Sequence, residues 1–420
     1  MARLILAALA AAISALGALT ALAGWALVVR FAARAAARAP QAADPTPPLT
    51  ILKPLHGIEP GLEDALASFC AQDYPEFQIV FGVQDAADPA CAVVARLIAR
   101  FPDVPIDLVV DATQYGTNRK VANLINMARL ACHDRWVIAD SDVIAAPDYL
   151  RRIAVALENP GIGLVTTLYA GRPVVPGRAA ALGAMQITYG FLPGALLSRA
   201  MQRQDCLGAT MALRRETLAR IGGLEALADH LADDNALGRK VAGLGLGVAL
   251  AETVPETGVP ETGLAALFSH ELRWARTIRV LVPGAFAASA LQYPILWAVL
   301  AFAAAPAERT ALLVALAWMA RAVAARGIGA VLAVPGRIGP DGRPGEAAGL
   351  AFAAPLWLLP LRELMSVAVM IASYAGRGVS WRGHHLMADG PAPLTQSAGL
   401  PPADLPPTSG LTLQRDETLP

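Results

Sequence analysis

An apolar run near the start of the chain constrains the fold more than any other feature. Leu4 to Val29 contains no charged side chain. A helix needs roughly 20 apolar residues to cross the hydrocarbon core of a bilayer. A cleaved signal peptide is the alternative, because small residues are frequent near the end of the run, but such a peptide has an apolar core of only about 7 to 15 residues. We therefore predict a transmembrane anchor at residues 1–30.

The charges around this run predict its orientation. Arg30, Arg34 and Arg38 follow the run, whereas only Arg3 precedes it. The positive-inside rule then places the next segment in the cytoplasm, so we expect a multi-pass protein of the inner, cytoplasmic membrane with its main domain on the cytoplasmic side. The four cysteines show no CxxC spacing, which argues against a disulfide framework and a zinc site.

Composition supports a membrane protein and argues against a nucleic-acid partner. The chain has 420 residues with a mean hydropathy of +0.47, which is high for a soluble protein. Its 34 basic residues are balanced by 34 acidic ones. A zero net charge offers no electrostatic attraction for a phosphate backbone.

Further apolar segments lie near the other end of the chain. We predict transmembrane or interfacial helices over residues 280–376, in the candidate spans Val280–Ala305, Ala311–Val334 and Leu350–Tyr374. Arg321, Arg362 and Glu363 fall inside these spans and should point into the bundle or lie at its edge, because a charge facing lipid is costly. The number of crossings stays open. Residues 391–420 are rich in Pro, Ser and Thr and predict a disordered tail.

One apolar segment has two open interpretations. Leu182 to Leu197 is interrupted by Gly and Pro and is shorter than a span. It predicts either an interfacial helix that gives a lipid access to a site or a buried core helix.

The region between the anchors, residues 48–279, alternates short apolar runs with helical segments. The runs "LTILKPL", "FQIVFGVQD", "IDLVVD", "RWVIADSD" and "IGLVTTLY" suit strands, and Ala87–Phe101 and Asn118–Ala131 suit helices. This alternation predicts an α/β domain with a mainly parallel sheet.

Aspartates follow three of these predicted strands, namely Asp85, Asp111, and the pair Asp140 and Asp142. Ligands of open α/β sheets bind beyond the carboxyl ends of the strands. Two carboxylates as close as Asp140 and Asp142 repel each other unless a cation or a proton intervenes. Mg²⁺ or Mn²⁺ would relieve that repulsion and bridge the carboxylates to a substrate diphosphate.

The D-x-D pattern alone has other interpretations. Haloacid-dehalogenase phosphatases also place two aspartates after a strand, but with a Thr where this chain has Ile144. A solvated turn in which Asp142 caps a helix is the non-functional alternative.

Several motifs together resemble a known family. They are "KPLHGIEPGLEDALASFCAQDYP", "GVQDAADPA", "NRKVANL", the D-x-D pair, "ALRRETLARIGG", "DHLADDNALGRKV", "SHELRWARTIR" and "WRG" at Trp381–Gly383. Their order resembles that of family 2 glycosyltransferases and, more closely, of the ceramide glucosyltransferases of family 21. Within the family, "QIVFGVQDAADPA" and "HELRWARTIR" look most similar to the hopanoid-biosynthesis-associated branch.

The resemblance implies a fold and a set of roles. It implies a GT-A-type nucleotide-diphospho-sugar transferase domain that uses a UDP-sugar donor, Mg²⁺ or Mn²⁺, and a lipid acceptor, either a hopanoid or ceramide. The implied roles are nucleotide contact for Asp85, phosphate contact for Lys120, metal and diphosphate binding for Asp140 and Asp142, general base for Asp234, and closure of the donor and acceptor site for Arg273 and Trp274, with His270 beside them.

The acceptor side departs from the family pattern. His270 stands where many relatives have Gln or Arg, and Asn235 follows Asp234 where an aromatic residue is expected. His270 is also compatible with a plain polar position on an interfacial helix, and Trp274 with an interface anchor. Arg273, together with Arg276 and Arg279, could instead face anionic headgroups.

Three classes of function remain open. The first is an inverting glycosyltransferase that moves one sugar, glucose or N-acetylglucosamine, onto a lipid hydroxyl, with a hopanoid polyol (bacteriohopanetetrol) favoured over ceramide. The second is a processive polysaccharide synthase, for which more membrane helices and a Q-x-x-R-W motif are expected. The third is a membrane protein without enzymatic activity.

Overall fold

The computed structural model describes residues 1–332, 355–376, 378–381, 384–387 and 411–412. The chain forms two compact units. We call the first the sheet unit; it comprises Arg38–Leu168, Gln204–Gly258 and Ala392–Pro420. We call the second the helical unit; it comprises Met1–Ala37, Tyr169–Arg203 and Val259–Pro391. The predicted domain limits at 30, 48, 279 and 391 stay predictions.

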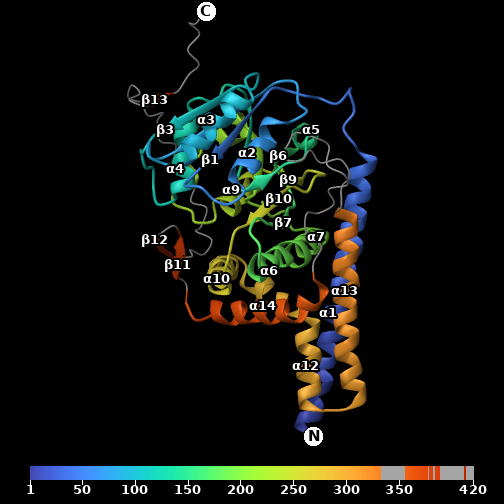
Figure 1. The fold of residues 1–420 in the computed structure, drawn as a ribbon. Helices are drawn as coiled ribbons and strands as arrows, with labels where there is room; N and C mark the ends of the chain where they lie inside the picture. The colour runs from blue at the N-terminus through green and yellow to red at the C-terminus, as the bar shows by residue number, and fades with distance from the viewer. Residues whose placement is uncertain (333–354, 377, 382–383, 388–410, 413–420) are drawn as a thin grey trace, which may run out of the picture. The chain divides into compact units, whose positions relative to one another are not determined.

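The sheet unit is built on one large sheet with the strand order β13-β3-β2-β1-β4-β8-β6-β9 (Figure 1). Four strands that are adjacent in this order, β3, β2, β1 and β4, are parallel to one another. Strands β6 and β9 are also parallel to each other, whereas β8 is antiparallel to its neighbours β4 and β6. All six residues of β1 are buried, which explains why its sequence does not alternate with polar residues. The strands are β1 (Leu49–Pro54), β2 (Phe77–Val83), β3 (Ile106–Val110), β4 (Arg135–Ala139), β6 (Ile162–Thr166), β8 (Thr210–Arg214), β9 (Gly247–Leu250) and β13 (Leu411–Thr412).

Helices connect these strands, as the alternating pattern predicts. The segments expected to be helical form α3 (Ala90–Arg100) and α4 (Arg119–Ala128). The other helices of this unit are α2 (Leu62–Cys70), α5 (Tyr149–Leu157), α8 (Arg215–Arg220) and α9 (Asp233–Gly243). The predicted α/β fold with a mainly parallel sheet is therefore confirmed.

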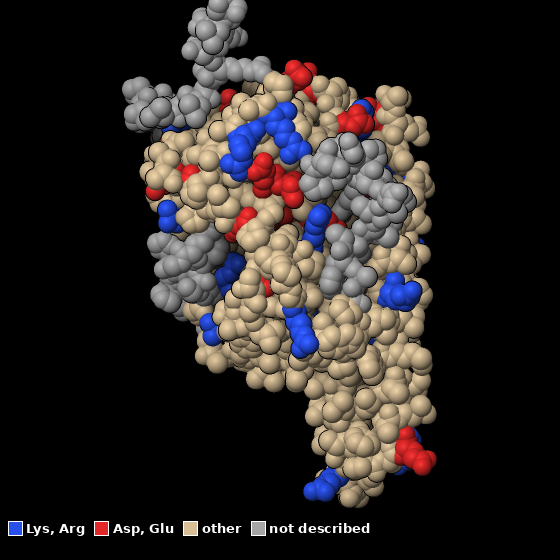
Figure 2. Space-filling view, in the orientation of Figure 1, with Lys and Arg blue, Asp and Glu red and all other residues tan. Residues whose placement is uncertain are grey.

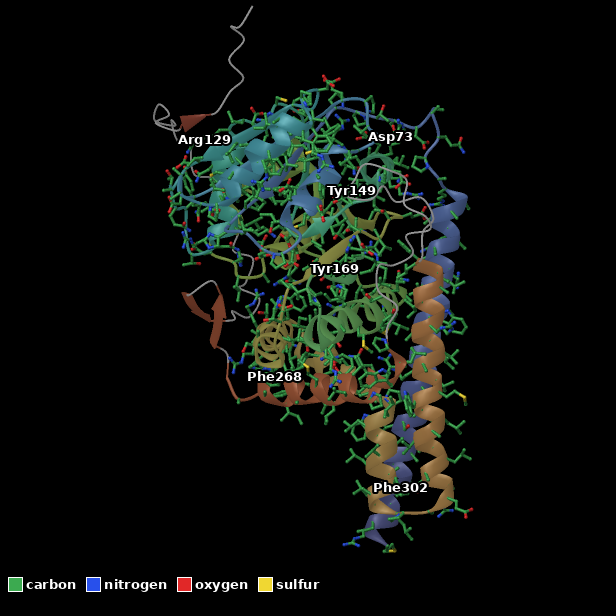
Figure 3. The ribbon with its side chains drawn as sticks, in the orientation of Figure 1. Asp73, Arg129, Tyr149, Tyr169, Phe268 and Phe302 are labelled. Carbon is green, nitrogen blue, oxygen red and sulfur yellow. The ribbon has the colours of Figure 1, made fainter. Side chains whose placement is uncertain are left out.

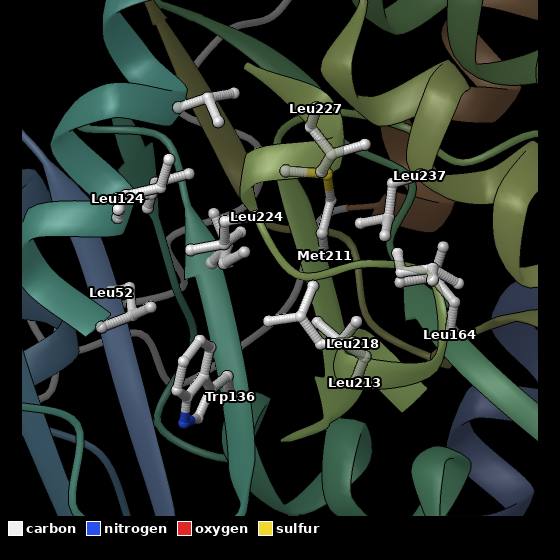
Figure 4. Packing of buried hydrophobic residues seen from close by; sticks show 14 of the residues in the cluster. Leu52, Leu124, Trp136, Leu164, Met211, Leu213, Leu218, Leu224, Leu227 and Leu237 are labelled. Carbon is white, nitrogen blue, oxygen red and sulfur yellow. The ribbon is translucent and has the colours of Figure 1, made fainter. Parts of the chain in front are cut away.

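The core of the sheet unit lies between the central strands and the helices α4 and α9. Leu52, Leu124, Met211 and Leu237 are at most 1% exposed, and Figure 4 shows them packed in one cluster with Trp136. Burying one such side chain stabilises a fold by roughly 1.5 to 3 kcal/mol. This packing fixes β4 and α4, whose ends carry the candidate site residues.

The helical unit contains the apolar segments. Four described helices or helical runs are long and apolar enough to cross a membrane, and a fifth candidate is a pair of helices bent by 68°. The predicted span Val280–Ala305 is this bent pair. The helices of the unit are α1 (Ala2–Ala37), α6 (Arg178–Gln186), α7 (Leu192–Ala200), α10 (Leu264–Leu281), α11 (Pro283–Ala288), α12 (Pro294–Ala304), α13 (Glu308–Leu332) and α14 (Leu359–Ser373).

The run Leu182–Leu197 is helical, as both interpretations predict, but it belongs to a longer helical run than the sequence suggests. The helices α6 and α7 join through a π-helical turn at Ile187–Phe191 and form one run, Arg178–Ala200, of 23 residues. The ring of Pro193 excludes a normal helical bond to the carbonyl four residues earlier, and a π turn is a known way to accommodate such a residue. The freed Tyr189 carbonyl accepts a hydrogen bond from Arg321 at 3.3 Å. The chain therefore replaces the backbone bond that Pro193 removes.

The charged residues of the apolar segments point inward, as predicted. Arg362 and Glu363 are each 2% exposed. Arg362 donates to both carboxylate oxygens of Glu271 at 2.7 and 2.6 Å, and Arg321 lies 3.1 Å from Glu363. Each buried charge thus faces a charge of opposite sign.

Two sequence predictions fall on the last part of the chain. Of the predicted disordered tail, only Leu411–Thr412 belongs to the described residues; it pairs with β3. Of the "WRG" motif, Trp381 belongs to β11 (Gly378–Trp381), which pairs with β12 (His384–Met387), and residues 382–383 lie outside the described part.

Candidate active site

The D-x-D pair lies on a turn between two strands of the sheet unit. Strand β4 ends at Ala139, and β5 (Val143–Ile144) begins directly after Asp142 and pairs with β10 (Glu256–Val259). The Thr257 hydroxyl donates to the Asp142 carboxylate, and the N–H of Gly258 donates to the Asp142 carbonyl at 3.1 Å. The strand β10 therefore holds Asp142 by its side chain and its main chain.

The charge of Asp142 is poorly stabilised by the protein alone. Burial and the nearby Asp140 raise its pKa from 3.8 to about 6, against the opposing effect of the Thr257 hydrogen bond. A pKa raised in this way indicates negative charge that a cation would relieve.

Lys53 lies directly beneath the D-x-D turn. It is the penultimate residue of β1, is fully buried, and donates from Nζ to the Asp140 carbonyl at 2.8 Å. Its Nζ also lies 3.6 Å from the ring centroid of Phe69. Burial lowers the pKa of Lys53 to about 7, although Asp142 and Asp140 act in the opposite direction.

Lys120 links the D-x-D turn to the acidic segment before α9. It occupies the first turn of α4, where the Asn118 side chain caps the helix by accepting from the N–H of Val121 at 3.1 Å. Its Nζ lies 2.7 Å from Asp140 and 3.6 Å from Asp233. Burial acts to lower the pKa of Lys120, but the surrounding carboxylates, with Asp140 first, outweigh it and raise the pKa. Lys120 is therefore a fixed cation.

Hydrogen bonds between two loops bring Lys120 and Asp233 together. The N–H of Thr117 donates to Asp229 at 2.9 Å, and the Asn118 amide donates to the His230 carbonyl at 2.8 Å. Gly116 allows this approach, because its φ is +119° and a Cβ there would lie 2.8 Å from the Ala228 carbonyl oxygen.

Asp233 and Asp234 occupy different surroundings at the start of α9. Asp233 is 7% exposed, faces Lys120, and has one carboxylate oxygen, Oδ2, without a hydrogen bond among the described residues. Burial and Asp233 raise the pKa of Asp234 to about 6, against the effect of Lys120. Gly208 leaves room for the Asp234 carboxylate, since a Cβ at position 208 would lie 3.0 Å from its Oδ2. An aspartate with this pKa is a suitable proton acceptor near neutral pH.

The site as a whole carries an excess of negative charge, with the four carboxylates of Asp140, Asp142, Asp233 and Asp234 against Lys53 and Lys120. Among the described residues, no group of three or more His, Cys, Asp and Glu side chains could hold a metal ion. The D-x-D pair offers two carboxylates. Mg²⁺ and Mn²⁺ use one or two protein carboxylates and complete their coordination with water and substrate phosphates, so the pair is chemically suited to either ion.

Asp85 lies in the same unit but outside these contacts. It is exposed on the turn that follows β2, and its carboxylate accepts from the N–H of Ala87 at 2.9 Å. Within the described contacts it has no link to Asp140 or Lys120.

His270, Arg273 and Trp274 belong to the helical unit. All three lie on α10, where the His270 and Trp274 rings meet edge to face with centroids 4.4 Å apart. The Nδ1 atom of His270 contacts the carboxylate of Glu261. Burial acts to raise the pKa of Glu261, but His270 outweighs it and holds the pKa below its usual value. The helix α10 thus carries an oriented imidazole.

Sequence reasoning missed Lys53, Asp233 as a partner of Lys120, and Thr257. The lysine near the end of an apolar strand is a sequence signal that could have indicated Lys53. In the structure β1 pairs with β4, with Leu52 opposite Ile138, so the ends of these two strands lie next to each other. Nothing in the sequence joins Thr257 to Asp142 across 115 positions.

Comparison with curated proteins finds ceramide glucosyltransferases. The chain is 31% identical to the ceramide glucosyltransferase of Candida albicans over 30% of this chain and 25% of that protein. It is 24% identical to ceramide glucosyltransferase 1 of Caenorhabditis elegans over 59% of this chain and 54% of that protein. The chain thus spans about half, or less, of the length of these relatives.

Comparison with solved structures finds glycosyltransferases. One is a mannosyltransferase from Pyrobaculum calidifontis in complex with GDP-Man and Mn²⁺, with a TM-score of 0.46, 19% identity, and coverage of 86% of this chain and 99% of that chain. Another is the glucosyl-3-phosphoglycerate synthase of Mycobacterium tuberculosis in complex with Mn²⁺, UDP and glucosyl-3-phosphoglycerate, with a TM-score of 0.34, 17% identity, and coverage of 56% and 79%.

A family profile decides the classification. The profile described as "Glycosyl transferase family 21" matches residues 5–390, which include the apolar helix α1, the whole D-x-D region and α10. The predicted glycosyltransferase class is thereby confirmed at the level of the family. The chain belongs to glycosyl transferase family 21.

Proposed function

We propose that the protein is a membrane-bound inverting glycosyltransferase that transfers one sugar, glucose or N-acetylglucosamine, from a UDP-sugar to a lipid hydroxyl. The carrying observation is the charged cluster in which Lys120 contacts both Asp140 and Asp233 and Asp234 lies beside them. In this family 21 chain, the cluster places Asp140 and Lys120, which are suited to bind a metal diphosphate, close to Asp234, a carboxylate that can accept a proton.

Asp140 and Asp142 would hold the divalent ion, which when bound neutralises charge on the leaving diphosphate. Lys120 reaches both acidic segments and can exchange its contact with Asp140 for a donor phosphate. Lys53 holds the Asp140 carbonyl from below and thus keeps the turn in place. Asp85 is proposed to contact the nucleotide, and His270, Arg273 and Trp274 to close the donor and acceptor side.

The proton and electron changes can be assigned to these groups. The acceptor hydroxyl oxygen attacks C1 of the donor sugar and forms a new C1–O bond. The bond between C1 and the phosphate oxygen breaks, and its electron pair leaves with UDP. Asp234 accepts the hydroxyl proton, and a single displacement of this kind inverts the configuration at C1.

For the acceptor we propose a hopanoid polyol, with ceramide second. The segments "QIVFGVQDAADPA" and "HELRWARTIR" support the hopanoid polyol through their resemblance to that branch of the family. The curated relatives named ceramide glucosyltransferases support ceramide. Both acceptors present a hydroxyl group at a membrane surface.

An assay with defined lipids tests the proposal. The purified protein in lipid nanodiscs would receive UDP-glucose or UDP-N-acetylglucosamine with bacteriohopanetetrol or ceramide, and products would be identified by mass spectrometry. We expect one sugar per lipid on bacteriohopanetetrol. Preference for ceramide would reverse the acceptor assignment, a polymer product would favour a processive synthase, and absence of transfer in every combination would contradict the proposed activity.

A further inference from the structure

The polarity of α14 is inverted relative to a helix of a soluble protein. Its outward stripe consists of Trp357, just before the helix, and Leu361, Leu364 and Ile371, which are 59%, 42%, 57% and 67% exposed. The spacing of four, three and seven residues places these side chains on one face. The opposite face carries Arg362 and Glu363, both 2% exposed, and Ser366.

The polar face of α14 is held by four other helices of the same unit. Arg362 pairs with Glu271 of α10, and the Ser366 hydroxyl donates to Gln186 of α6 at 3.0 Å. Glu363 lies 3.1 Å from Arg321 of α13 and accepts from the N–H of Ile295 of α12 at 2.9 Å. These contacts pair each charged group of the polar face with an opposite charge inside the protein, and the apolar stripe faces outward.

The contact with Ile295 also fixes the level of α14 along α12. Ile295 belongs to the first turn of α12, so α14 meets α12 where that helix begins. With 11 residues at 1.5 Å each, α12 is only about 16 Å long. This is less than the roughly 30 Å of the hydrocarbon core, so α12 alone is too short to cross it.

The direction of α14 differs from that of the bundle. Figure 1 shows α1, α12 and α13 side by side, whereas α14 runs across them. Helices that cross one another in this way cannot all follow the bilayer normal. Since α1 and α13 are the longer helices, with 36 and 25 residues, they define the normal and α14 lies in the plane.

The surface around α14 is suited to lipid. The Trp318 indole of α13 donates to the Leu356 carbonyl at 3.1 Å, and this joins the α14 stripe to the exposed apolar side chains of α13. Phe302 projects from α12 in Figure 3 and is 39% exposed. Figure 2 shows the surface around α12 without charged side chains until its far end.

Both ends of α14 combine an aromatic ring with a guanidinium group. Arg178 lies 5.7 Å from the Trp357 ring, and Arg279 lies 5.2 Å from the Tyr374 ring. Aromatic rings favour the membrane interface, and long basic side chains extend from there to lipid phosphates.

We propose that α14 is an in-plane membrane helix: it lies parallel to the membrane surface at the level where α12 begins, with Trp357, Leu361, Leu364 and Ile371 against the acyl chains, and it does not cross the bilayer. This inference stands independently of the proposed enzymatic activity.

Spin labels at matched spacing test the orientation. In full-length protein carrying Cys70→Ala, Cys91→Ser, Cys132→Ser and Cys206→Ala, labels would be attached one at a time to Trp357→Cys, Leu364→Cys and Ile371→Cys. Membrane depth would be measured in nanodiscs from the accessibility of each label to oxygen and to a nickel complex. We expect similar depth at all three positions, with oxygen access exceeding nickel access.

Two positions on α13 provide the control. Leu312 and Met319 are exposed and also seven residues apart, so labels there should differ in depth by about 10 Å. A depth maximum at position 364, with both flanking labels about 10 Å shallower, would show that α14 spans the bilayer. Nickel access exceeding oxygen access at all three positions would show that the stripe faces water. Either result overturns the proposal.

A second measurement avoids the cysteine substitutions. Wild-type protein would be irradiated in nanodiscs that contain a phospholipid with a diazirine in its acyl chain. Mass spectrometry should find adducts on Leu361, Leu364 and Ile371 as well as on Phe302. Adducts on Phe302 without any on the α14 stripe would contradict the proposal.

Discussion

Asp142 and Asp234 are ionisable residues in surroundings that oppose their charge. Burial and a neighbouring acid raise the pKa of Asp142 and of Asp234 from 3.8 to about 6. Lys53 and Lys120 offset only part of this charge. Such sites cost folding stability and provide the reactivity that binding and proton transfer require.

Replacing the proposed base tests its role directly. Asp234→Asn keeps the size of the side chain but removes its ability to accept a proton. Because general-base assistance contributes about 10² to 10⁴ in rate, transfer should fall by that factor while UDP-sugar affinity, measured by calorimetry, changes little. Asp233→Asn should be milder for transfer. If Asp233→Asn abolishes transfer and Asp234→Asn does not, the two roles are exchanged.

The same residue predicts a pH dependence. At saturating Mg²⁺, the transfer rate should fall about tenfold per pH unit below pH 6, because protonated Asp234 accepts no proton. Its folded pKa, about 6, exceeds the ordinary value of 3.8, so the ionised form destabilises the fold above pH 6 and this cost disappears near pH 4. Asp234→Asn should therefore raise stability at pH 8, by on the order of 3 kcal/mol. Equal thermal stability of the two proteins at pH 8 would contradict the raised pKa.

Metal binding is predicted to depend on Asp140. Asp140→Asn removes one proposed ligand and the partner of Lys120, so Mn²⁺ affinity should fall at least about tenfold, the equivalent of 1.4 kcal/mol. Electron paramagnetic resonance of free Mn²⁺ measures this without any turnover. Asp73→Asn is the control, because Asp73 is 70% exposed and paired with Arg151 on the surface (Figure 3). Unchanged Mn²⁺ affinity in Asp140→Asn would exclude the D-x-D pair as the metal site.

Individual residues differ in how well the sequence predicts them. Asp140 and Asp142 are visible because two acids follow an apolar strand. Lys120 is assigned to phosphate only through the family resemblance, and its contacts with Asp140 and Asp233 require the loops at Thr117 and Asp229 to meet. The sequence does not encode such loop contacts in any local pattern.

At the scale of elements, the apolar runs predict five strands of the sheet unit, namely β1, β2, β3, β4 and β6, and two of its helices, α3 and α4. The sequence underestimates the length of the run Arg178–Ala200, where Gly190 and Pro193 interrupt the apolar residues. A π turn continues the helix there, and the Tyr189 carbonyl accepts its hydrogen bond from Arg321, a residue 132 positions away. Similarly, hydropathy marks α14 as a span, whereas the contacts of its polar face with α6, α10, α12 and α13 give it a different role.

The pair Glu271–Arg362 is predicted to hold α10 against α14. Arg362→Met leaves the Glu271 carboxylate buried without its partner, which typically destabilises a protein by about 3 to 5 kcal/mol. The double variant Glu271→Leu with Arg362→Met buries no charge and should recover most of this loss. Thermal unfolding in detergent measures both effects. A double variant no more stable than Arg362→Met would show that the two residues are not energetically coupled.

At the scale of the whole molecule, composition predicts a membrane protein and the alternation of apolar runs with helical segments predicts an α/β domain. The structure has the α/β sheet and four described helices or helical runs that are long and apolar enough to cross a membrane. The division of the chain is harder to predict, because both units take segments that are far apart in sequence. Tyr169–Arg203 joins the helical unit although it lies between strands of the sheet unit. A scan along the sequence draws contiguous domains and misses this exchange.

The orientation of the whole molecule gives the last prediction. Figure 1 shows the N-terminus and the turn between α12 and α13 at the same end of the bundle. Arg30, Arg34 and Arg38 at the other end should face the cytoplasm, so this turn should lie on the opposite side. Pro306→Cys in intact cells should then react with a membrane-impermeant maleimide. The native Cys132, which is exposed in the sheet unit, is an internal control that should react only after the membrane is permeabilised. Labelling of Cys132 in intact cells would reverse the topology and would separate the proposed site from the cytoplasm, where UDP-sugars are made.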